Sequence, residues 1–399
     1  MVDEQERGTT DDFRISNLNM VATNPALAIT EGAACDGRYL YVTPHDQYVI
    51  AKIDTRSFKI VDTLDLSKVD AGFTGMAGSF VAGGYLYVLP HMSNSGPVYQ
   101  DNVVRVDLGN FTPAGCDSLA VLDAGKSLSA LGGLTDGTNG YLNITVSNQI
   151  AVTRFGLGAS FNAKSVSTVS IPTIAGYPVL LGTLVAVDKS NAYVVATVVT
   201  YAGTGNNDRT MDLWLVSIPT ANFTAKAAKF QRLTNVPYLG GSVPKVYTAV
   251  DDGKNLWCPP MPILAGPMVG SFLGVMKIPK ANPAAVSIQQ GRSAKAPTSA
   301  AAAGCTSVYD GWRYGYIASQ SNAQIMQLDT QEGGRIDLID ISAKSGGYPM
   351  FGLGYDGHWV YAVSFNGGAG LCLRLRASQS PSDKDKDKDD DGCPCCEPS

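Results

Sequence analysis

The sequence has little charge and no long apolar segment. Only 16% of its 399 residues are charged, whereas 45% are hydrophobic. Such a composition excludes a disordered chain, a coiled coil and a small disulfide-stapled domain. No run of about 18 apolar residues occurs, so the sequence predicts no membrane-spanning helix. The first twelve residues also lack the basic start and apolar stretch of a signal peptide.

The few charges are unevenly distributed. Residues 1–12 carry a net charge of −4 and residues 383–397 another −4, whereas the whole chain carries −5. The body between the two ends is therefore slightly positive. Its charge is too weak and too dispersed to favour nucleic-acid binding as the main task.

Histidine is scarce, and the cysteines fall into two groups. A hydrolase of the triad type needs a nucleophile, a base and an orienting acid. The chain has only three histidines that could act as the base and no Gly-x-Ser-x-Gly sequence to supply the nucleophile. Cysteines dispersed along a chain usually serve as small buried apolar side chains. The two groups are the dispersed Cys35, Cys116, Cys258, Cys305 and Cys372, and the terminal Cys393, Cys395 and Cys396.

Short segments recur along the chain. Residues 39–45 (YLYVTPH) and 85–91 (YLYVLPH) are identical at six of seven positions. Residues 48–66 (YVIAKIDTRSFKIVDTLDL) align without a gap with residues 323–341 (AQIMQLDTQEGGRIDLIDI), including an Asp-Thr step. Residues 217–223 (SIPTANF) align in the same way with KIPKANP, which begins at Lys277. These independent pairings indicate an internal repeat.

Turn signals give the number of units. Each signal precedes an aromatic or β-branched run such as LYV or WVYAVS. We expect primed hairpin turns, in which both central residues have positive φ. Seven such signals occur: Asp36-Gly37, Gly83-Gly84, Asp136-Gly137, Asp188-Lys189, Asp252-Gly253, Asp310-Gly311 and Asp356-Gly357.

Each unit has the content of a four-stranded sheet. An inner strand rich in small residues precedes the turn, and a second strand, a variable loop, a third strand ending near Asp and a fourth strand follow. Residues 49–54 and 325–329 are predicted third strands, and 59–66 and 335–341 are predicted fourth strands. Helical periodicity is scarcely visible. Repeated four-stranded units predict an all-β fold, a seven-bladed β-propeller.

The predicted propeller covers residues 13–377. An acidic arm (1–12) precedes it, and a linker with an acidic, Cys-rich tail (378–399), disordered or extended, follows it. The last unit lacks a fourth strand of its own, whereas residues 13–20 (FRISNLNM) alternate apolar and polar side chains. We therefore expect residues 13–20 to form the outermost strand of the last blade and to close the ring.

The repeat resembles that of the YVTN family of β-propellers. The segment LYVTPHDQYVIAKIDTRSFKIVDTLDL is similar to that family's unit, which reads roughly LYVTN, a short loop, V-x-V-I-D-T and a final strand. Tyr41, Val42 and Thr43 match, whereas Pro44 replaces the Asn. The match is good in the first and sixth units. Because the group includes surface-layer and secreted proteins as well as enzymes, the resemblance implies an extracytoplasmic setting and names no reaction.

His45 and His91 occupy equivalent positions in two consecutive units, and Met261 falls at the corresponding place in the fifth. One interpretation is a metal or ligand site on that face, because imidazole is a common metal ligand. The alternative is a duplicated Pro-His turn in which each imidazole bonds the local backbone. No acidic partner recurs beside both histidines.

Extended insertions follow the second strand of units two, four and five, at residues 93–101, 202–210 and 261–271. Rigid rings that display variable loops are typical recognition surfaces. Tyr99, Tyr201 and Met268 are candidate contact residues. The alternative is ordinary variation in loop length.

Three Asn-x-Thr triplets fit the N-glycosylation pattern and begin at Asn110, Asn143 and Asn222. They could carry glycans only if the chain passes through a eukaryotic secretory route.

The tail combines acidic residues with cysteines. Asp387, Asp389 and Asp391, followed by Gly, fit the start of a calcium loop, although the twelfth position holds Pro398 instead of Glu. The alternative is a solvated charge run. An odd number of exposed cysteines, here Cys393, Cys395 and Cys396, favours a disulfide to another chain or to the ring in an oxidising setting.

These features favour a non-enzymatic structural or protein-interaction propeller on an extracellular, cell or particle surface. One loop-rich face would serve recognition, and the tail would attach the ring to a partner or a neighbouring copy. The competing functions are a propeller enzyme, a hydrolase or lyase acting on a sugar or lactone, and a carbohydrate-binding lectin. The repeats share scaffold residues instead of pocket residues, which argues against the lectin.

Overall fold

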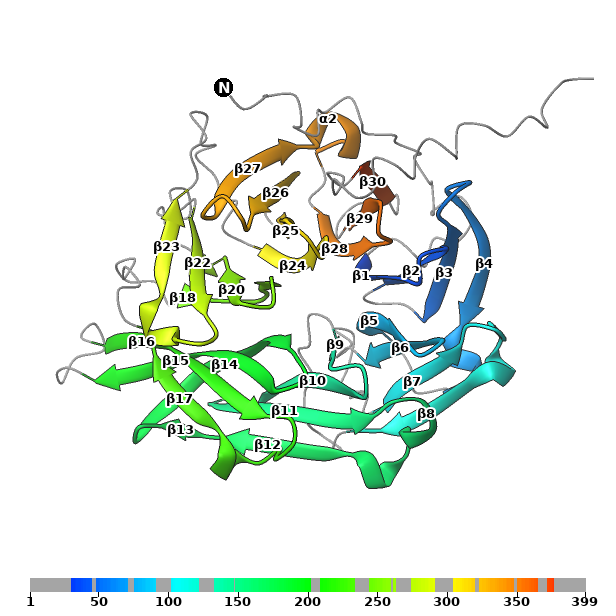
Figure 1. Cartoon of the computed structure of the whole chain (residues 1–399). Helices are drawn as coiled ribbons and strands as arrows, with labels where there is room; N and C mark the ends of the chain where they lie inside the picture. Colours follow the sequence, from blue (N-terminus) through cyan, green and yellow to red (C-terminus); the bar gives the residue numbers. More distant parts are fainter. Residues whose placement is uncertain are drawn as a thin grey trace, which may run out of the picture.

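The computed structural model confirms an all-β fold. It describes residues 30–44, 48–70, 75–90, 102–121, 133–146, 148–201, 209–233, 244–259, 261–262, 274–290, 304–319, 323–347, 350–364 and 372–376. Seven of the sheets, with three to five strands each, stand around a central axis (Figure 1). The chain is a seven-bladed β-propeller, as the turn signals predicted.

Each blade is an antiparallel meander, and consecutive strands pair with one another. Blade 1 consists of β1 (Thr30–Cys35), β2 (Tyr39–Pro44), β3 (Val49–Asp54) and β4 (Lys59–Asp65), and blade 2 of β5 (Met76–Ala82), β6 (Tyr85–Pro90), β7 (Asn102–Asp107) and β8 (Cys116–Ala120). Blade 3 consists of β9 (Leu134–Thr135), β10 (Asn139–Val146), β11 (Gln149–Gly156) and β12 (Ser167–Ile171). Blade 4 consists of β13 (Thr173–Ile174), β14 (Tyr177–Val187), β15 (Asn191–Tyr201), β16 (Arg209–Pro219) and β17 (Lys229–Arg232). Blade 5 consists of β19 (Val250–Asp251), β20 (Asn255–Cys258), β22 (Gly274–Pro279) and β23 (Ser287–Gln290). Blade 6 consists of β24 (Gly304–Tyr309), β25 (Tyr314–Ser319), β26 (Gln324–Asp329) and β27 (Arg335–Asp340), and blade 7 of β28 (Met350–Tyr355), β29 (Trp359–Ser364) and β30 (Cys372–Arg376).

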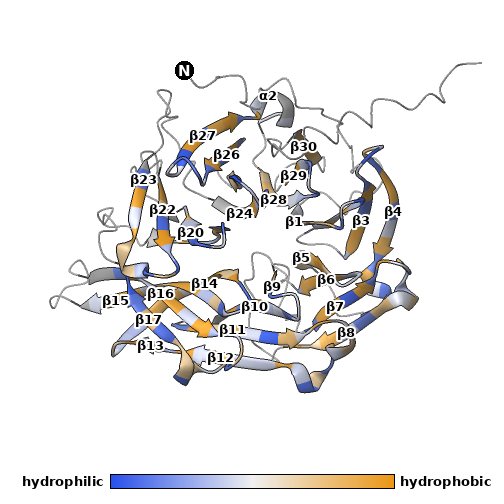
Figure 2. Cartoon of the chain, in the orientation of Figure 1, coloured by the Kyte–Doolittle hydropathy of each residue, from blue (hydrophilic) through white to orange (hydrophobic). Residues whose placement is uncertain are grey.

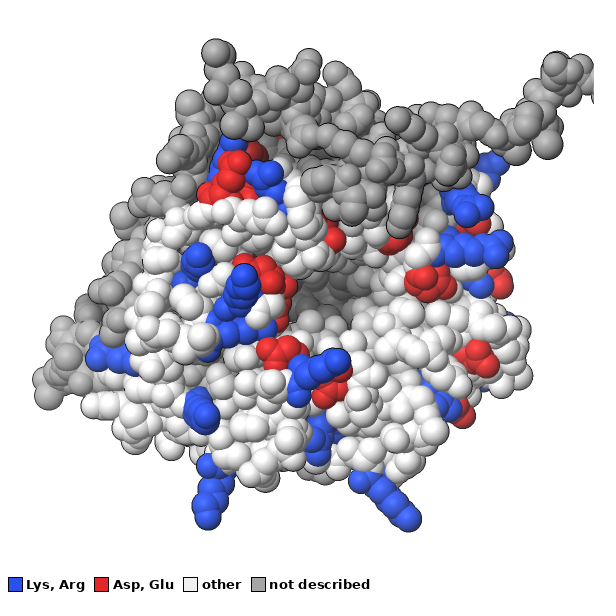
Figure 3. Space-filling view, viewed as in Figure 1, with Lys and Arg blue, Asp and Glu red and all other residues white. Residues whose placement is uncertain are grey.

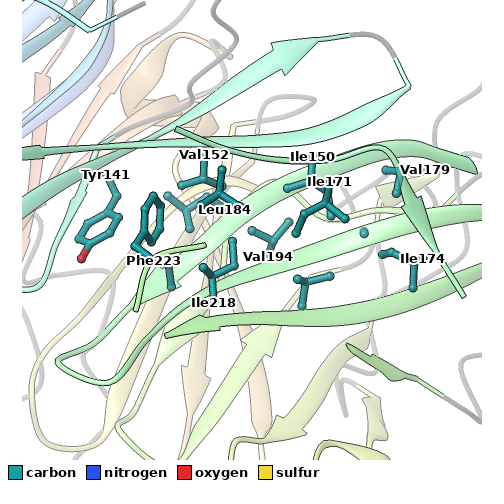
Figure 4. Close-up of a cluster of buried hydrophobic side chains, with 14 of the residues drawn as sticks. Tyr141, Ile150, Val152, Ile171, Ile174, Val179, Leu184, Val194, Ile218 and Phe223 are labelled. Atoms are coloured by element: carbon teal, nitrogen blue, oxygen red, sulfur yellow. The ribbon is translucent and has the colours of Figure 1, made fainter. Parts of the chain in front are cut away.

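The core lies between neighbouring blades. Apolar residues, in orange, recur along the strands in Figure 2 and alternate with more hydrophilic ones. Between blades 3 and 4, Ile150, Val194 and Phe223 belong to one buried cluster (Figure 4). Burying one such side chain stabilises the fold by about 1.5–3 kcal/mol. Gly182 is needed in this cluster, because a Cβ there would lie 2.5 Å from Cγ1 of Ile150.

Inner strands approach closely at the axis. A Cβ on Gly32 of β1 would lie 2.6 Å from the Cα of Gly78 in β5, so only glycine fits there. Hydroxyl groups make further bonds between inner strands: Ser307 Oγ of blade 6 donates to the carbonyl oxygen of Ala249 at 2.8 Å. Thr306 donates in the same way to Phe351 of blade 7. The axis is therefore lined by small residues, as the repeat pattern predicted.

Blade 4 is larger than the sequence suggested. Its strands β14, β15 and β16 are 11 residues long, and the extra strand β13 precedes them. A two-residue turn joins β13 to β14, with positive φ at Ala175 and Gly176. The sequence did not show this extension, because Ser/Thr-rich segments without charge read equally well as loop.

A cation on the third strand links each of several blades to the next. Arg154 pairs across the strands with the buried Tyr141, and its Nη1 donates to the carbonyl oxygen of Thr220 in blade 4 at 2.8 Å. Its guanidinium also lies 4.9 Å from the ring centre of Phe223. Such a cation–aromatic contact is worth about 0.5–2 kcal/mol. We call this arrangement the blade clamp; the equivalent cation and ring pairs are Lys52 with Phe111, Arg105 with Phe161 and Arg374 with Phe58.

The ring closes between blades 7 and 1. Nη1 of Arg374 in β30 donates to the carbonyl oxygen of Thr55 at 2.9 Å, and Tyr361 packs near Phe58 with ring centres 6.1 Å apart. Within the described residues blade 7 has three strands. The predicted closing strand (13–20), the acidic arm and the tail lie outside the described residues.

Candidate functional site

The turns between the first and second strands of the blades stand at the mouth of the central channel, where acidic side chains surround a hollow (Figure 3). Gly83 and Gly84 both have positive φ, as expected for a primed turn. The Asp-Gly turns differ from that expectation. In these turns only the glycine, such as Gly37, has positive φ. The turn is held instead by the aspartate side chain, which accepts hydrogen bonds from the backbone amides that follow it.

The turn of blade 3 shows the arrangement shared by five blades. Oδ1 of Asp136 accepts hydrogen bonds from the backbone amides of Thr138 and Asn139, at 2.8 and 2.7 Å. Oδ2 accepts the hydroxyl hydrogen of Tyr141 at 2.7 Å. Both carboxylate oxygens are therefore used within the turn. The same bond joins Asp36 to Tyr41, Asp188 to Tyr193, Asp252 to Trp257 and Asp356 to Tyr361.

These bonds fix the ionisation of the pair. Burial alone would raise the pKa of Asp136, but the hydrogen bonds from Tyr141 and the turn amides outweigh it and lower the pKa. The pKa of Tyr141 is raised, because its hydroxyl is buried and donates to a carboxylate. At neutral pH the pair is an ionised carboxylate and a neutral phenol, which suits a structural bond better than proton transfer.

Blade 6 has the same Asp-Gly signal and a different result. Oδ1 of Asp310 accepts from the amides of Trp312 and Arg313, at 2.8 and 2.7 Å. Oδ2 is buried without a hydrogen-bond partner. The nearest equivalent ring is Tyr316, whose hydroxyl instead accepts from Nε2 of Gln327 at 3.2 Å.

Asp310 is the carboxyl at the channel mouth whose pKa is raised. Burial raises it, and the turn amides compensate only in part. A carboxyl with a raised pKa is the kind of group that serves as a general acid. Its free oxygen is, however, enclosed by the protein, so it does not reach a molecule in the channel in this conformation.

The described cysteine thiols are poor nucleophiles. Burial raises the pKa of Cys35 to about 12 and that of Cys116 to about 11. Cys258 and Cys372 are buried and their pKa values are raised further for the same reason. Because the thiolate is the reactive form, all four thiols are poorly reactive. Cys258 and Cys372 are buried, as the sequence predicted, whereas Cys35 and Cys116 are only half-buried.

Most of the residues singled out from the sequence fall outside the described part of the chain. Those residues are His45, His91, Tyr99, Met268, Asp387, Asp389, Asp391, Cys393, Cys395 and Cys396. Their proposed ligand, calcium and disulfide roles stay predictions. Among the residues that the structure does describe, no group of three or more His, Cys, Asp or Glu side chains could hold a metal ion.

Met261 and Tyr201 are placed by their backbones. Met261 begins β21 (Met261–Pro262), which pairs with β18 (Pro244–Lys245) beside blade 5. Tyr201 is the last residue of β15 and pairs with Arg209, so the predicted loop 202–210 is shorter than expected. The backbones of β15 and β16 pair along all 11 residues of each strand, so the strands extend into the segment predicted as a loop.

The Asn-x-Thr triplets do not share one environment. Asn143 is buried: its Nδ2 donates to the carbonyl oxygen of Gly182 at 3.1 Å, and its Oδ1 accepts the amide hydrogen of Leu184. Asn143 therefore joins blade 3 to the inner strand of blade 4. Asn110 and Asn222 are exposed beside the buried Phe111 and Phe223, which receive the blade clamps.

A simple spacing could have revealed the turn bonds in advance. In each of the five complete turns an aromatic residue with a hydrogen-bond donor stands five positions after the aspartate. The sequences are DGRYLY, DGTNGY, DKSNAY, DGKNLW and DGHWVY. Blade 6 reads DGWRYGY, with one additional residue. The signal is therefore the position of the aromatic residue and not the turn glycine alone.

The comparisons with known proteins concern the fold alone. No family model matches the chain, and no curated protein sequence does. Within the described residues no helix is long and apolar enough to cross a membrane. The chain is similar to a hydrazine synthase chain of Kuenenia stuttgartiensis, with a TM-score of 0.56 and 14% identity over 88% of this chain and 96% of that one. It also matches the Cps50 (Swd1) β-propeller domain of Myceliophteria thermophila, with a TM-score of 0.49, 9% identity and coverage of 88% and 97%. The first similarity supports the propeller fold that the sheets display.

Proposed function

We propose that the chain is a non-enzymatic structural or interaction propeller on an extracellular, cell or particle surface. One observation carries the proposal: the repeated polar groups at the channel mouth serve the scaffold. In five turns both carboxylate oxygens of the aspartate are occupied within the blade or by a neighbouring lysine. Lys280, for example, reaches Asp188 of blade 4 at 2.8 Å. A ring built in this way offers a rigid platform more readily than a reaction centre.

Recognition is assigned to the loops that follow the second strands, and attachment to the C-terminal tail. The support for the attachment role is compositional: three cysteines and a charge run follow the last blade. Surface display draws on the resemblance to the YVTN repeat.

The competing enzyme has one observation in its favour. Asp310 is a buried carboxyl with a raised pKa beside the channel mouth, and its second oxygen has no partner. If a loop movement exposed this oxygen, the carboxyl could donate a proton to a bound sugar or lactone. Asp310→Asn would then abolish an activity that the wild type shows on a panel of such substrates.

Non-reducing electrophoresis of the purified full chain tests attachment. Wild type should migrate as covalent oligomers or adducts, whereas a chain ending at Ala377 should run as a monomer. A variant with Cys393, Cys395 and Cys396 replaced by Ser is the matched control, because it keeps the acidic residues and loses only the thiols. Identical monomer bands for all three proteins would remove the covalent attachment from the proposal.

Antibody labelling of intact source cells tests surface display. A signal that arises only after the cells are permeabilised would contradict surface display.

A further inference from the structure

The outer edge of blade 4 carries three exposed cations, of which one has an acidic partner among the described residues. It is formed by β17 and by the short 3-10 helix η8 (Ala225–Ala227), which packs against β12 of blade 3. Lys226, Lys229 and Arg232 are exposed there, and residues 221–233 contain no acidic residue. We call these three side chains the basic edge. In Figure 3 basic side chains project from the lower rim over blades 3 and 4 with no acidic side chain beside them.

Other outer edges mix the two signs. On blade 2, Arg105 forms an ion pair with Asp117, and on blade 6, Arg335 lies 3.4 Å from Asp337. On the basic edge only Arg232 has an acidic partner, Asp212 of β16, at 2.9 Å. Its side chain is still 56% exposed. No ion pair of Lys226 or Lys229 occurs among the described residues, so the edge keeps an excess of positive charge.

The basic edge also has an apolar centre. Phe230 lies between Lys229 and Arg232 in β17 and is 40% exposed, although it is a large aromatic residue. Aromatic residues and arginine are enriched in protein interfaces. β17 is moreover the outermost strand of its sheet, so its outer backbone groups are open to a further extended segment.

The chain itself contains an acidic segment of matching form. Residues 383–391 read DKDKDKDDD. In an extended chain alternate side chains point to opposite sides. The five aspartates at odd positions, 383 to 391, would then share one side, and the three lysines would share the other with Asp390. A segment with a net charge of only −3 can in this way present a wholly acidic face.

We propose that the basic edge of blade 4 binds the acidic C-terminal segment of a second copy of this chain. The inference rests on the proposed attachment role of the tail and names its receptor. A second copy is favoured because the last described strand, β30, belongs to blade 7, which lies across the channel from blade 4 (Figure 1). Docking between copies leads from ring to ring and produces a chain of propellers.

Sedimentation of the full chain under reducing conditions tests the inference, because it removes any disulfide contribution. Wild type should associate reversibly at low salt, and the association should weaken as salt rises and shortens the Debye length from about 10 Å at 0.1 M to about 3 Å at 1 M. Lys226→Glu/Lys229→Glu should weaken association about tenfold or more. The matched control is Arg56→Glu/Lys59→Glu on the edge of blade 1, which changes the net charge equally and should associate like wild type.

A labelled peptide of residues 382–392 supplies the second readout. It should bind the chain ending at Ala377 and should not bind that chain with Lys226→Glu/Lys229→Glu. Three results would overturn the inference: equal loss in the blade 1 control, unchanged association in the blade 4 variant, or equal binding of the peptide to the chain ending at Ala377 with and without Lys226→Glu/Lys229→Glu. If removal of the tail abolishes association while the blade 4 variant behaves like wild type, the tail attaches elsewhere. In that case the proposed function survives and this inference fails.

Discussion

Blades 1 and 6 share the best repeat match and differ by one residue at the channel mouth. Blade 1 reads DGRYLY and blade 6 reads DGWRYGY, so Trp312 is an insertion into an otherwise similar turn. In blade 1 the hydroxyl of Tyr41 bonds Oδ2 of Asp36 at 2.8 Å, whereas in blade 6 the equivalent oxygen of Asp310 has no partner. The comparison teaches that the number of residues from the aspartate to the aromatic ring decides whether the second carboxylate oxygen is bonded, since Oδ1 accepts turn amides in both blades.

The two blades agree at their outer turn. The hydroxyl of Thr55 donates to the carbonyl oxygen of Arg38 at 2.9 Å, and that of Thr330 donates to Arg313 at 2.8 Å. The Asp-Thr step therefore does the same work in both blades. The insertion of Trp312 affects the inner half of the blade and leaves the outer half unchanged.

The largest effect is expected from deletion of residues 1–22, which tests whether blade 1 depends on its closing neighbour. If residues 13–20 complete blade 7, their loss opens the edge of β30 beside blade 1. Two or three apolar side chains at about 1.5–3 kcal/mol each predict a loss of roughly 5 kcal/mol. Guanidinium denaturation measures it. Deletion of residues 1–12 is the control and should leave the midpoint in place; an equally small effect of both deletions would refute closure by this segment.

Insertion of Trp between Gly37 and Arg38 should convert the turn of blade 1 into that of blade 6. Asp36 and the buried Tyr41 would lose each other as partners, and a buried unsatisfied group costs about 1–3 kcal/mol. We expect the free energy of unfolding to fall by about 3 kcal/mol. Insertion of Ser at the same place separates spacing from side-chain size. Full stability of both variants would mean that the bond is unimportant.

Arg374→Met should weaken the boundary at which blade 7 meets blade 1. The substitution keeps the apolar stem and removes both the bond to Thr55 and the contact with Phe58, so a loss of about 1–2 kcal/mol is expected. Lys277→Met is the control, since Lys277 lies over Trp257 of its own blade. Hydrogen exchange should speed up in β2 and β3 only in the Arg374 variant.

Deletion of Trp312 should convert the turn of blade 6 into that of blade 1. Tyr316 would then stand five positions after Asp310 and could donate to its free oxygen. We expect a gain of about 1 kcal/mol from the new hydrogen bond, measured by the denaturation midpoint. A destabilised variant would show that the packing of Trp312 outweighs the missing bond.

The smallest effect concerns pH. The pKa of Asp310 is raised in the folded protein, so the folded state binds this proton more tightly than the unfolded state. The wild type therefore loses the associated stability as pH rises above about 4, the usual carboxyl range. Asp310→Asn removes this loss and should gain stability over wild type at pH 7 more than at pH 4. Asp136→Asn should do the reverse, because the lowered pKa of Asp136 stabilises the fold at neutral pH and loses that effect in acid.

The sequence predicted the architecture well because each blade repeats local signals. Turn glycines, alternating apolar strands and the Asp-Thr step are all short-range, so they are visible without a structure. The blade clamps were not predicted. Arg154 reads as an ordinary solvated cation until Phe223, which lies in the next blade, is brought beside it.

The candidate site could be predicted less well. The free oxygen of Asp310 follows from one inserted residue, which a search for turn glycines does not detect. The length of β14 to β16 depends on pairing between strands that carry few charges or turn residues. His45, His91 and the tail lie outside the described residues, so their roles rest on the sequence alone.

The blade clamps bear on how such rings change during evolution. A cation encoded in one repeat finds its aromatic partner in the following repeat, and the last cation, Arg374, finds it in the first. A duplicated or exchanged repeat therefore inherits half of two different contacts. The span from each cation to its partner, such as Lys52 to Phe111, also contains the next cation, here Arg105. A single repeat therefore cannot be moved between rings with its clamps intact, whichever residue it begins at.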